Sequence, residues 1–348
     1  MKTTAAVLVT LRESLELIDL EIPALKPGQV LVEIRYSGVC HTQLMEWQGQ
    51  RGEDRFLPHC LGHEGSGTII DVGPNIKKCR PGDKVILSWM KGHGADVPGT
   101  QYRCGQRTVN AGGITTFMRH AILSENRVTP LVEELSATEA AFLGCAVATG
   151  LGSVKNTLNI SQGSSVLVIG LGGIGLFAVA GAKFNGANPI IAADINDQRL
   201  SSAKNMGATH LLNVKGSNLL KELQRICPGG VSYAIEATGQ VNVMQQALSA
   251  VKPRGGAVAI IGNAAFGQTL SLDPSELNQG KKLFGTWGGD NHPDDDFLTY
   301  QRLFAEKKLS ADALRPTVYS LENINQALID FHNRSVTRPL IDMQMLDS

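Results

Sequence analysis

The chain lacks an excess of charge of either sign. Among its 348 residues, 32 are lysine or arginine and 32 are aspartate or glutamate, so the formal net charge is zero. Proteins that bind nucleic acid normally carry a basic excess, so we expect no nucleic-acid partner. With 43% hydrophobic and 18% charged residues, the composition is that of a globular protein and argues against a disordered chain.

The chain also lacks a long uninterrupted apolar run. The N-terminal segment reaches charged residues within a few positions of its apolar stretch, so we expect neither a signal peptide nor a membrane span there. The longest apolar stretch, residues 165–182, is interrupted by glycines, which is typical of a strand, a turn and a helix. Without an export signal we expect a cytoplasmic protein, and its six cysteines are then metal ligands or free thiols rather than disulfides.

Proline is scarce, whereas glycine is abundant. The chain has 14 prolines, 38 glycines and no internal repeat, which together indicate many tight turns and close backbone approaches. Its length is that of roughly two domains.

The first 130 residues show short apolar segments between turn signals. The predicted strands are residues 5–9, 15–22, 30–36, 67–72, 84–88 and 117–122. Helical periodicity is rare in this part, so it is predicted to be mostly β. A helix is predicted to begin at Ser136, because Glu139 three residues later completes the pattern of a capping box.

From residue 164 to about residue 262, apolar strands alternate with helices. The predicted strands are residues 164–170, 189–194, 210–214, 231–239 and 256–262, with a helix between each pair. This alternation predicts a parallel sheet covered on both faces, which is a doubly wound α/β domain. The residues after 288 are predicted to add a helix and a last strand that return to the first domain.

A glycine-rich turn opens this alternating region. Residues 170–175 read Gly-Leu-Gly-Gly-Ile-Gly between a buried strand and a helix, and Asp194 ends the next strand. Gly170 would make the tight turn, Gly172 would let the backbone approach a pyrophosphate, and Gly175 would let the helix pack closely. The helix N-terminus would attract the phosphates. Because Asp194 would accept hydrogen bonds from ribose hydroxyls and repel a 2′-phosphate, the predicted cofactor is NAD rather than NADP.

Two cysteines and one histidine lie in segments that could form a metal site. Cys40 follows a predicted strand, His63 lies in a glycine-rich run, and Cys145 precedes the alternating region. One histidine and two cysteines can bind a catalytic zinc ion and leave its fourth position open. On position alone, three unrelated buried residues are an equal alternative.

Together these motifs resemble the medium-chain, zinc-dependent alcohol dehydrogenase family. SGVCHT at Cys40 and GCAVATG at Cys145 are similar to its first and last zinc-ligand segments, and GHEGSG at His63 is similar to its GHExxG motif. The glycine-rich turn and Asp194 match its cofactor fingerprint, and the resemblance runs in order along nearly the whole chain. A cysteine at position 145 favours the alcohol and formaldehyde dehydrogenase branch over the sorbitol type.

The resemblance implies an α/β chain of two domains. Residues 1–146, completed by residues 288–348, would form a mostly β, GroES-like catalytic domain. Residues 147–287 would form a Rossmann domain with a doubly wound parallel sheet.

The resemblance also implies roles for individual residues. Cys40, His63 and Cys145 would bind the catalytic zinc ion. Glu64 would lie behind the metal or bind it briefly, and Thr42 would hydrogen-bond the alcohol and carry its proton. The residues implied at the cofactor are His41 and Arg338 on the pyrophosphate, Gly170, Gly172, Gly173, Ile174 and Gly175 in the turn, Asp194 and Arg199 at the adenosine ribose, and Thr149, Thr238, Ile261 and Gly262 at the nicotinamide.

The function implied is hydride transfer between NAD and an alcohol/aldehyde or alcohol/ketone pair. A bulky or aromatic alcohol is predicted, because residues 110–113 are small where the family carries bulky side chains. The residues expected to line that pocket are Trp89, Ala111, Gly112, Asn263 and Trp287. The alternatives are a formaldehyde-adduct dehydrogenase, a zinc-free enone or quinone reductase, and a protein that keeps the fold without enzymatic activity.

The sequence departs from the family pattern in the segment that usually holds a second, structural zinc ion. Residues 88–113 contain only Cys104 and His93 as ligand candidates, so we predict one catalytic zinc ion and no structural one. The alternative is that Cys60, Cys79 or Cys227 completes a second site.

Two further departures lie beside the first zinc-ligand segment. Gln43 stands where an aspartate usually orients the zinc-bound histidine, and its amide is expected to accept that hydrogen bond without the negative charge. Met45 replaces a histidine that often ends the proton relay.

The resemblance further implies a homo-oligomer, either a dimer or a tetramer. The apolar segment 258–262 is expected to be an exposed edge strand, which would be a liability in an isolated chain and could pair with a second copy.

Overall fold

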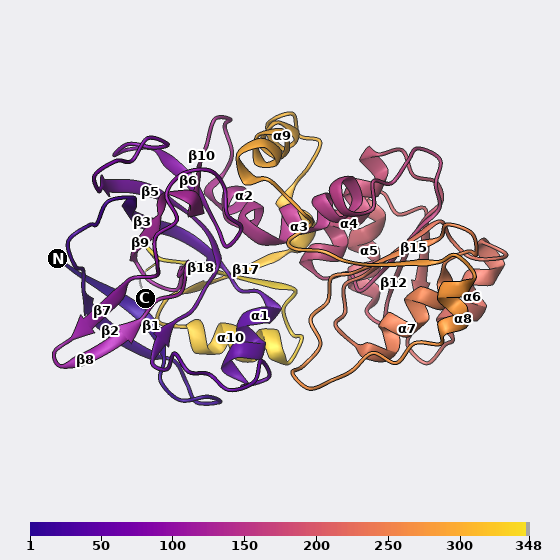
Figure 1. The fold of residues 1–348 in the computed structure, drawn as a ribbon, viewed down its shortest axis with the longest axis horizontal. Coiled ribbons are helices and arrows are strands. Elements are labelled where there is room, and N and C mark those ends of the chain that lie inside the picture. The colour runs from indigo at the N-terminus through magenta and orange to yellow at the C-terminus, as the bar shows by residue number, and fades with distance from the viewer. Residues whose placement is uncertain (346–348) are drawn as a thin grey trace. The chain divides into compact units, whose positions relative to one another are not determined.

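The computed structural model describes residues 1–345, and the chain divides into two compact units (Figure 1). The first unit holds Met1–Cys145 together with the residues from His292 onward, and the second unit holds Ala146–Asn291. The chain therefore leaves the first unit after Cys145 and returns to it at His292.

The first unit is built mainly from β-strands. They are β1 (Lys2–Leu8), β2 (Glu16–Glu21), β3 (Gln29–Gly38), β4 (His59–Cys60), β5 (Glu64–Val72), β6 (Lys84–Ser88), β7 (Gln101–Cys104), β8 (Arg107–Asn110), β9 (His120–Ser124), β10 (Val128–Pro130), β17 (Pro316–Ser320) and β18 (Arg338–Asp342). A closed barrel has the order β1-β2-β7-β8-β4, and a second sheet has the order β10-β6-β5-β3-β18-β17, with β9 also paired to β3. The predicted mostly β character of this part is confirmed.

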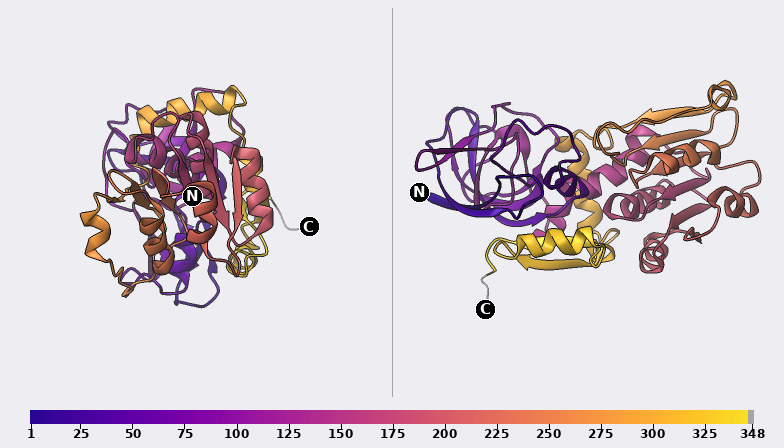
Figure 2. Two further views of the ribbon diagram at one scale, coloured as in Figure 1. Left: turned by 90° about the vertical axis from the view of Figure 1, so that its right-hand side faces the viewer. Right: turned by 90° about the horizontal axis from the view of Figure 1, so that it is seen from below.

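The helices of the first unit follow the strands β3 and β10 and lie in its C-terminal segment. They are α1 (His41–Trp47), α2 (Ala137–Phe142), α9 (Pro293–Ala305) and α10 (Ile324–His332), with 3₁₀ turns at Glu125–Arg127 and Ala311–Leu314. Figure 2 shows α10 beside the C-terminal strands, in yellow, which agrees with its contacts to β17 and β18. The last strand joins the N-terminal sheet directly, since Leu340 of β18 lies opposite Gly38 of β3.

Local sequence signals explain several of these elements. β6 covers the same residues as the predicted strand 84–88, and its residues 85–88 are buried. The helix predicted at Ser136 begins there, because the Ser136 hydroxyl accepts the Glu139 N–H at 3.2 Å and the Glu139 carboxylate accepts the Ser136 N–H at 3.0 Å. Apolar side chains such as Val32, Ile34 and Ile69 from the paired strands β3 and β5 fill the core of the unit.

The helix that starts with α2 continues through π-helical turns at Leu143–Val147 and Ser153–Thr157, on either side of α3 (Ala148–Gly152). From Ala137 to Thr157 it is long and apolar enough to span a membrane, but 83% of its most apolar window is buried in the protein. That burial is typical of a core helix.

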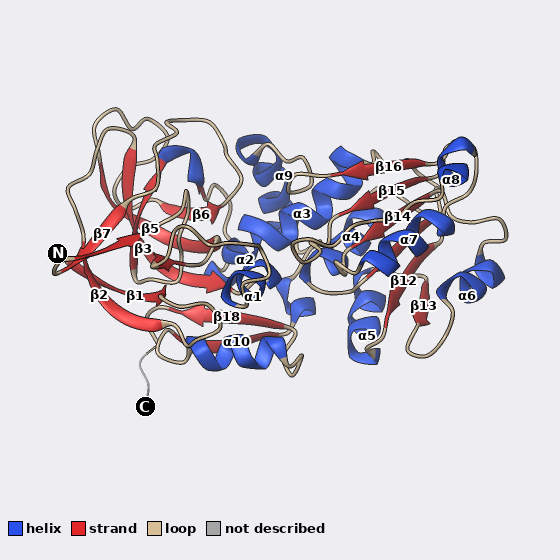
Figure 3. Cartoon of the chain, turned by 60° about the horizontal axis from the view of Figure 1, so that its bottom comes forward, coloured by secondary structure: helices blue, strands red, loops and turns tan. Residues whose placement is uncertain are grey.

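The second unit is a parallel sheet with helices on both faces (Figure 3). Its strands are β11 (Val166–Ile169), β12 (Ile190–Asp194), β13 (His210–Asn213), β14 (Tyr233–Glu236), β15 (Ala257–Ile260) and β16 (Lys282–Gly285), in the order β13-β12-β11-β14-β15-β16. Its other helices are α4 (Gly173–Phe184), α5 (Asp197–Met206), α6 (Leu219–Ile226), α7 (Val241–Ala250) and α8 (Pro274–Asn278). α4 packs with α5 and α6 packs with α7, so the predicted doubly wound α/β fold is confirmed.

The prediction that residues 258–262 form an exposed edge strand is wrong. β15 is an interior strand, because β16 pairs with it in parallel, with Ala259 opposite Phe284. The short strand β16 carries little apolar pattern, and the side chain of Phe284 is 38% exposed. The edge of this sheet beside β15 is therefore β16.

Residues 88–113, where the family usually holds a structural zinc ion, form a hairpin and a loop. β7 and β8 pair in antiparallel fashion, and Cys104 at the end of β7 is exposed. The Glu125 carboxylate accepts backbone N–H bonds from Lys77 at 2.6 Å, Lys78 at 2.8 Å and Ala95 at 2.9 Å. Glu125 therefore links this loop, at Ala95, to the backbone of residues 77–78.

Candidate metal centre and cofactor site

Three separate elements of the first unit bring the predicted zinc ligands together. Cys40 is the N-cap residue of α1, His63 directly precedes β5, and Cys145 lies in the π-helical turn after α2. The two sulfur atoms and one ring nitrogen all lie within 4.8 Å of one another. Cys40 and Cys145 are buried, and His63 is half-buried.

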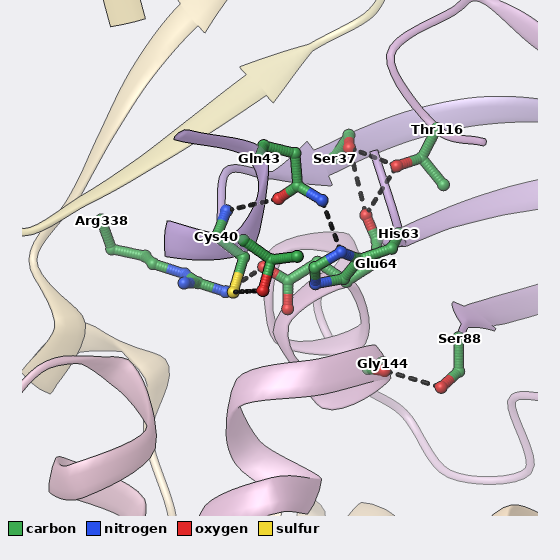
Figure 4. A network of polar contacts seen from close by, with 10 residues as sticks. Ser37, Cys40, Gln43, His63, Glu64, Ser88, Thr116, Gly144 and Arg338 are labelled. Carbon is green, nitrogen blue, oxygen red and sulfur yellow. Dashed lines mark hydrogen bonds and ion pairs between the residues drawn. The ribbon is translucent and has the colours of Figure 1, made fainter. Parts of the chain in front are cut away.

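Glycines allow the backbone to bend at two of the ligands. Gly62 has a φ of +93° directly before His63, a conformation that L side chains rarely adopt. A Cβ atom on Gly144 would collide with the Leu87 carbonyl oxygen, so only glycine fits beside Cys145. The Ser88 hydroxyl donates to the Gly144 carbonyl at 2.6 Å and fixes this π-helical turn (Figure 4). Such turns are frequent at functional sites.

The ligand side chains influence one another electrostatically. The Cys145 thiol donates a hydrogen bond that holds the pKa of Cys40 well below its usual range, and the same contact raises the pKa of Cys145. Burial lowers the pKa of His63, but the adjacent Cys40 sulfur outweighs this effect, so its pKa is raised. Cys40 therefore has the thiolate character that a metal ligand needs.

The donor set fits a zinc ion. Nε2 of His63 is buried and has no hydrogen-bond partner within residues 1–345, whereas Nδ1 of the same ring contacts Gln43. A buried polar atom without a partner is unusual and indicates a missing ligand. Two cysteine sulfurs and one imidazole nitrogen are the ligands that zinc takes in catalytic sites.

The predicted role of Gln43 as an acceptor for His63 is wrong. Its Oε1 accepts the backbone N–H of Cys40 at 2.9 Å, and its Nε2 faces Nδ1 of His63 (Figure 4). A glutamine at the third helical position commonly turns back to the N-cap N–H, and this directs the only acceptor atom of the amide towards Cys40 and its nitrogen towards His63. Because its oxygen is held at the start of α1, Gln43 presents its amide nitrogen, and not its oxygen, to His63.

Glu64 and Arg338 form a buried ion pair beside the three ligands. Nη2 of Arg338 contacts Oε1 of Glu64, and their side chains are 4% and 0% exposed. The Arg338 guanidinium also lies over the Phe142 ring, 5.5 Å from its centre. Glu64 is not a member of the three-residue metal cluster found among residues 1–345.

Two hydroxyl groups that were not predicted as functional residues also hold this region. Ser37 and Thr116 lie 2.7 Å apart, and each donates to the Glu64 carbonyl oxygen at 3.1 Å. Ser37 lies on β3, opposite Gly65 of β5. Ser37 begins the SGVCHT segment, but only the fold brings it to Thr116 and the Glu64 carbonyl, so the sequence did not indicate this contact.

The other predicted residues of α1 lie close to the metal cluster. The Thr42 hydroxyl is half-buried and lies 4.0 Å from Sγ of Cys40. His41 is exposed, and Met45 is buried with 3% of its surface exposed. Met45 thus offers no titratable group.

The glycine-rich turn of the second unit has the geometry of a phosphate-binding turn. Gly170 has a φ of +89°, and a Cβ on Gly175 would collide with the Gly170 carbonyl oxygen. A Cβ on Gly172 would meet nothing within 4 Å, so the backbone there is open to a ligand. Gly173 and Ile174 begin α4, whose free N–H groups follow directly.

Asp194 ends β12 beside this turn. Its carboxylate accepts the Leu171 N–H at 2.7 Å and the Asn196 N–H at 3.0 Å, and Arg199 lies 4.0 Å away. Each carboxylate oxygen can accept further bonds, so the group remains able to bind ribose hydroxyls.

The predicted nicotinamide residues are placed at strand ends or on the buried helix. Thr149 is 4% exposed and its hydroxyl has no partner within residues 1–345. Thr238 donates to the buried carboxylate of Glu236, and Ile261 and Gly262 follow β15. An open turn and an unpaired buried hydroxyl fit a dinucleotide.

The predicted pocket residues differ in exposure. Trp89 and Ala111 are half-buried, Gly112 and Asn263 are exposed, and the Trp287 side chain is 76% exposed. In the first unit, the Trp89 carbonyl accepts a bond from Arg127.

Comparison with known proteins agrees with these sites. Residues 26–133 match the alcohol dehydrogenase GroES-like domain, and residues 173–306 match the zinc-binding dehydrogenase domain. An S-(hydroxymethyl)glutathione dehydrogenase of Paracoccus denitrificans is 30% identical, over 98% of this chain and 100% of that protein. The chain belongs to the zinc-dependent alcohol dehydrogenase family.

Solved structures of this family have the same fold. Benzyl alcohol dehydrogenase of Acinetobacter calcoaceticus is 30% identical with a TM-score of 0.88, and it is matched over 98% of this chain and 99% of that chain. An alcohol dehydrogenase zinc-binding domain protein of Burkholderia ambifaria is 29% identical with a TM-score of 0.91, over 99% and 100% of the two chains. The chain is therefore an oxidoreductase of the alcohol dehydrogenase type, with a GroES-like and a Rossmann-like domain.

Proposed function

We propose that the protein transfers a hydride between NAD and an alcohol/aldehyde or alcohol/ketone pair, with one catalytic zinc ion per chain. The observation that carries this proposal is the cluster of Cys40, His63 and Cys145, in which the buried Nε2 of His63 lacks a hydrogen-bond partner among the described residues 1–345. A zinc ion held there would supply a Lewis acid that lowers the pKa of an alcohol and polarises a carbonyl group.

The chain's own residues would hold the substrate and move its proton. The Thr42 hydroxyl, which lies 4.0 Å from Sγ of Cys40, would hydrogen-bond the alcohol oxygen and accept its proton. Met45 cannot take that proton onward, so Thr42 would pass it to water or to a ribose hydroxyl of the cofactor. The buried ion pair with Arg338 would hold the negative charge of the Glu64 carboxylate in place beside the three metal ligands.

Metal analysis tests the zinc content. We expect close to one zinc ion per chain by mass spectrometry of the protein purified without added zinc. In support of the absence of a second ion, Cys104 is exposed, and the neighbouring loop is already held by the bond from the Ala95 N–H to Glu125. Cys145→Ser should lose zinc and most activity but keep NAD affinity. Two tightly held ions would contradict the proposal.

The cofactor preference is tested through Asp194. We expect a higher kcat/KM with NAD than with NADP, because the carboxylate repels a 2′-phosphate and Ile195 and Asn196 after it bring no positive charge. Asp194→Gly should reduce that preference. Both proteins keep Arg199, so the comparison changes only the Asp194 side chain. A wild-type preference for NADP would refute the assignment.

We propose a bulky or aromatic alcohol as the substrate. The small residues Ala111 and Gly112 and the indoles Trp89 and Trp287 would provide room and flat apolar walls, with Asn263 as a polar contact. The structural similarity to a benzyl alcohol dehydrogenase supports this choice. The similarity to S-(hydroxymethyl)glutathione dehydrogenases supports a second candidate, a formaldehyde-adduct dehydrogenase.

One substrate series separates the two candidates. Each matched methylene is worth about 0.8 kcal/mol, so kcat/KM should rise several-fold per carbon within the pocket. We expect benzyl or cinnamyl alcohol to exceed hexanol and ethanol under identical conditions. If ethanol or S-(hydroxymethyl)glutathione gives the highest kcat/KM, the small-substrate or formaldehyde role replaces the aromatic one.

We also propose a cytoplasmic homo-oligomer, a dimer or a tetramer. None of the six cysteines, all within residues 1–345, forms a disulfide, which fits a reducing compartment. The strand β16 presents an edge that a second copy could extend.

A further inference from the structure

Gln43 makes two buried contacts that fix the orientation of its amide. It is the third residue of α1, and its side chain is 1% exposed. The backbone N–H of Cys40 lies 2.9 Å from one end of the amide. Since a backbone N–H can only donate, that end must be the oxygen. The amide nitrogen therefore faces Nδ1 of His63 (Figure 4).

This orientation favours one tautomer of His63. An amide nitrogen only donates, so Nδ1 must accept and carries no proton. A neutral imidazole with a bare Nδ1 has its proton on Nε2. Nε2 is the buried atom without a partner, so it is the nitrogen available to a metal. The contact with Gln43 thus stabilises the tautomer that cannot bind through Nε2.

Metal binding through Nε2 requires the opposite tautomer. The ring would then carry its proton on Nδ1, and a zinc-bound histidine normally donates that proton to a carboxylate, carbonyl or water. Here the Nδ1 proton would face the N–H of the Gln43 amide. If the amide turned over, its oxygen could accept from His63, but its nitrogen would then face the Cys40 N–H. In either orientation the single amide oxygen faces one of the two donors, and the amide nitrogen faces the other.

A carboxylate at the same position would satisfy both donors. Glutamate has the length of glutamine and two acceptor oxygens, so one could accept from Cys40 and the other from His63. We propose that Gln43 is a positioning residue that weakens zinc binding at His63 and makes the catalytic zinc exchangeable. The proposal rests on the zinc site proposed above. Changes in such supporting residues typically alter metal affinity by about 10- to 100-fold.

The test compares zinc affinity rather than activity. Zinc is titrated into the zinc-free full chain against a chromophoric chelator of known affinity, and release of zinc into excess chelator gives the dissociation rate. In Gln43→Glu we expect a zinc Kd about 10- to 100-fold lower than in wild type, together with slower release. Gln43→Asp, the second carboxylate variant, should shift both quantities in the same direction. Thermal unfolding of the zinc-free proteins verifies that each variant folds.

A matched control exists at the other end of the same helix, where Gln48 is the C-cap residue of α1. The Gln48 amide nitrogen lies 2.8 Å from Nδ1 of His332, so Gln48→Glu also places a carboxylate beside a histidine, but away from the metal ligands. We expect Gln48→Glu to leave the zinc Kd within about twofold of wild type, as distant sites act independently.

The outcomes separate the proposed role of Gln43 from the proposed zinc site. An unchanged or higher zinc Kd in folded Gln43→Glu overturns the role of Gln43 while leaving the zinc site intact. An equal gain in Gln48→Glu overturns it too, because added negative charge alone would then explain the effect. If wild type takes up no zinc from micromolar solution, the proposed zinc function fails and this inference fails with it.

Discussion

At the scale of single residues, Glu64 and Arg338 form a buried ion pair in the first unit. Both groups are almost fully buried, and they join β5 to the last strand, β18. A buried charge without its partner is far more costly than an exposed one. The C-terminal strand is therefore tied to the metal region by charge as well as by its backbone pairing.

Arg338→Met should destabilise the protein strongly. It leaves the Glu64 carboxylate buried without its counter-ion, so we expect a loss of about 3–5 kcal/mol in the free energy of unfolding measured with urea. Lys91→Met is the matched control, because Lys91 pairs with Asp96 at the surface, where the two side chains are 55% and 54% exposed. That control should change stability by at most about 1 kcal/mol. Equal small losses in the two variants would mean that the buried pair adds little.

The buried carboxyl group of Glu236 should make the stability of the protein depend on pH. Burial raises the pKa of this carboxyl, although bonds from Thr238 and Gly239 lower it. Because the folded state then binds the proton more tightly than the unfolded state, ionisation costs stability as the pH rises above about 4.3. Glu236→Gln cannot ionise, so its Tm relative to wild type should rise from pH 4 to pH 7 in the cofactor-free protein. A difference that stays constant across this range would contradict the raised pKa.

The sequence was informative about residue types and less so about hydrogen-bond direction. Cys40, His63 and Cys145 carry recognisable motifs, and the structure brings them together. The polarity of the Gln43 contact could not be predicted, since it depends on the Cys40 N–H, which only the start of α1 orients.

At the scale of elements, prediction succeeded where local signals were strong. Lys84–Ser88 is an apolar strand, and Ser136 with Glu139 forms a complete capping box, so both were found where expected. The hairpin of β7 and β8 was missed because each strand buries a single residue, Tyr102 and Val109, and shows no apolar alternation.

The same reason explains the error about the sheet edge. β16 is short and mostly exposed, so its sequence gave no strand signal, and β15 was assigned to the edge in its place. In β16 the Lys282 N–H donates to Gly256 at 2.9 Å, so alternation directs the Gly285 N–H away from β15.

Gly285→Pro should weaken the proposed oligomer. Proline removes the outward N–H that a strand of a second copy would need, and a Cβ on Gly285 meets no atom within 4 Å. We expect light scattering to show a shift towards monomer, whereas Gly285→Ala, which keeps the N–H, should retain the wild-type mass. A monomeric wild type at micromolar concentration would contradict the oligomer, and an unchanged Gly285→Pro would exclude pairing at this edge.

At the scale of the whole molecule, the two units divide the chemistry. The first unit holds the metal cluster and Thr42, and the second unit holds the glycine-rich turn and Asp194. Each unit has its own apolar core, so a variant of one site should leave the other site's binding intact. The helix and last strand after residue 288 were expected to return to the first domain, and the first unit holds the residues from His292 onward.

The most direct test of the central claim is the rate of NADH formation from benzyl alcohol before and after zinc removal. The zinc-free protein is prepared with a chelator, assayed with NAD, and titrated with zinc in the same assay. We predict that activity is lost on removal and returns in proportion to added zinc, levelling off at one ion per chain. Full activity in the zinc-free protein would contradict the account and favour a metal-free reductase.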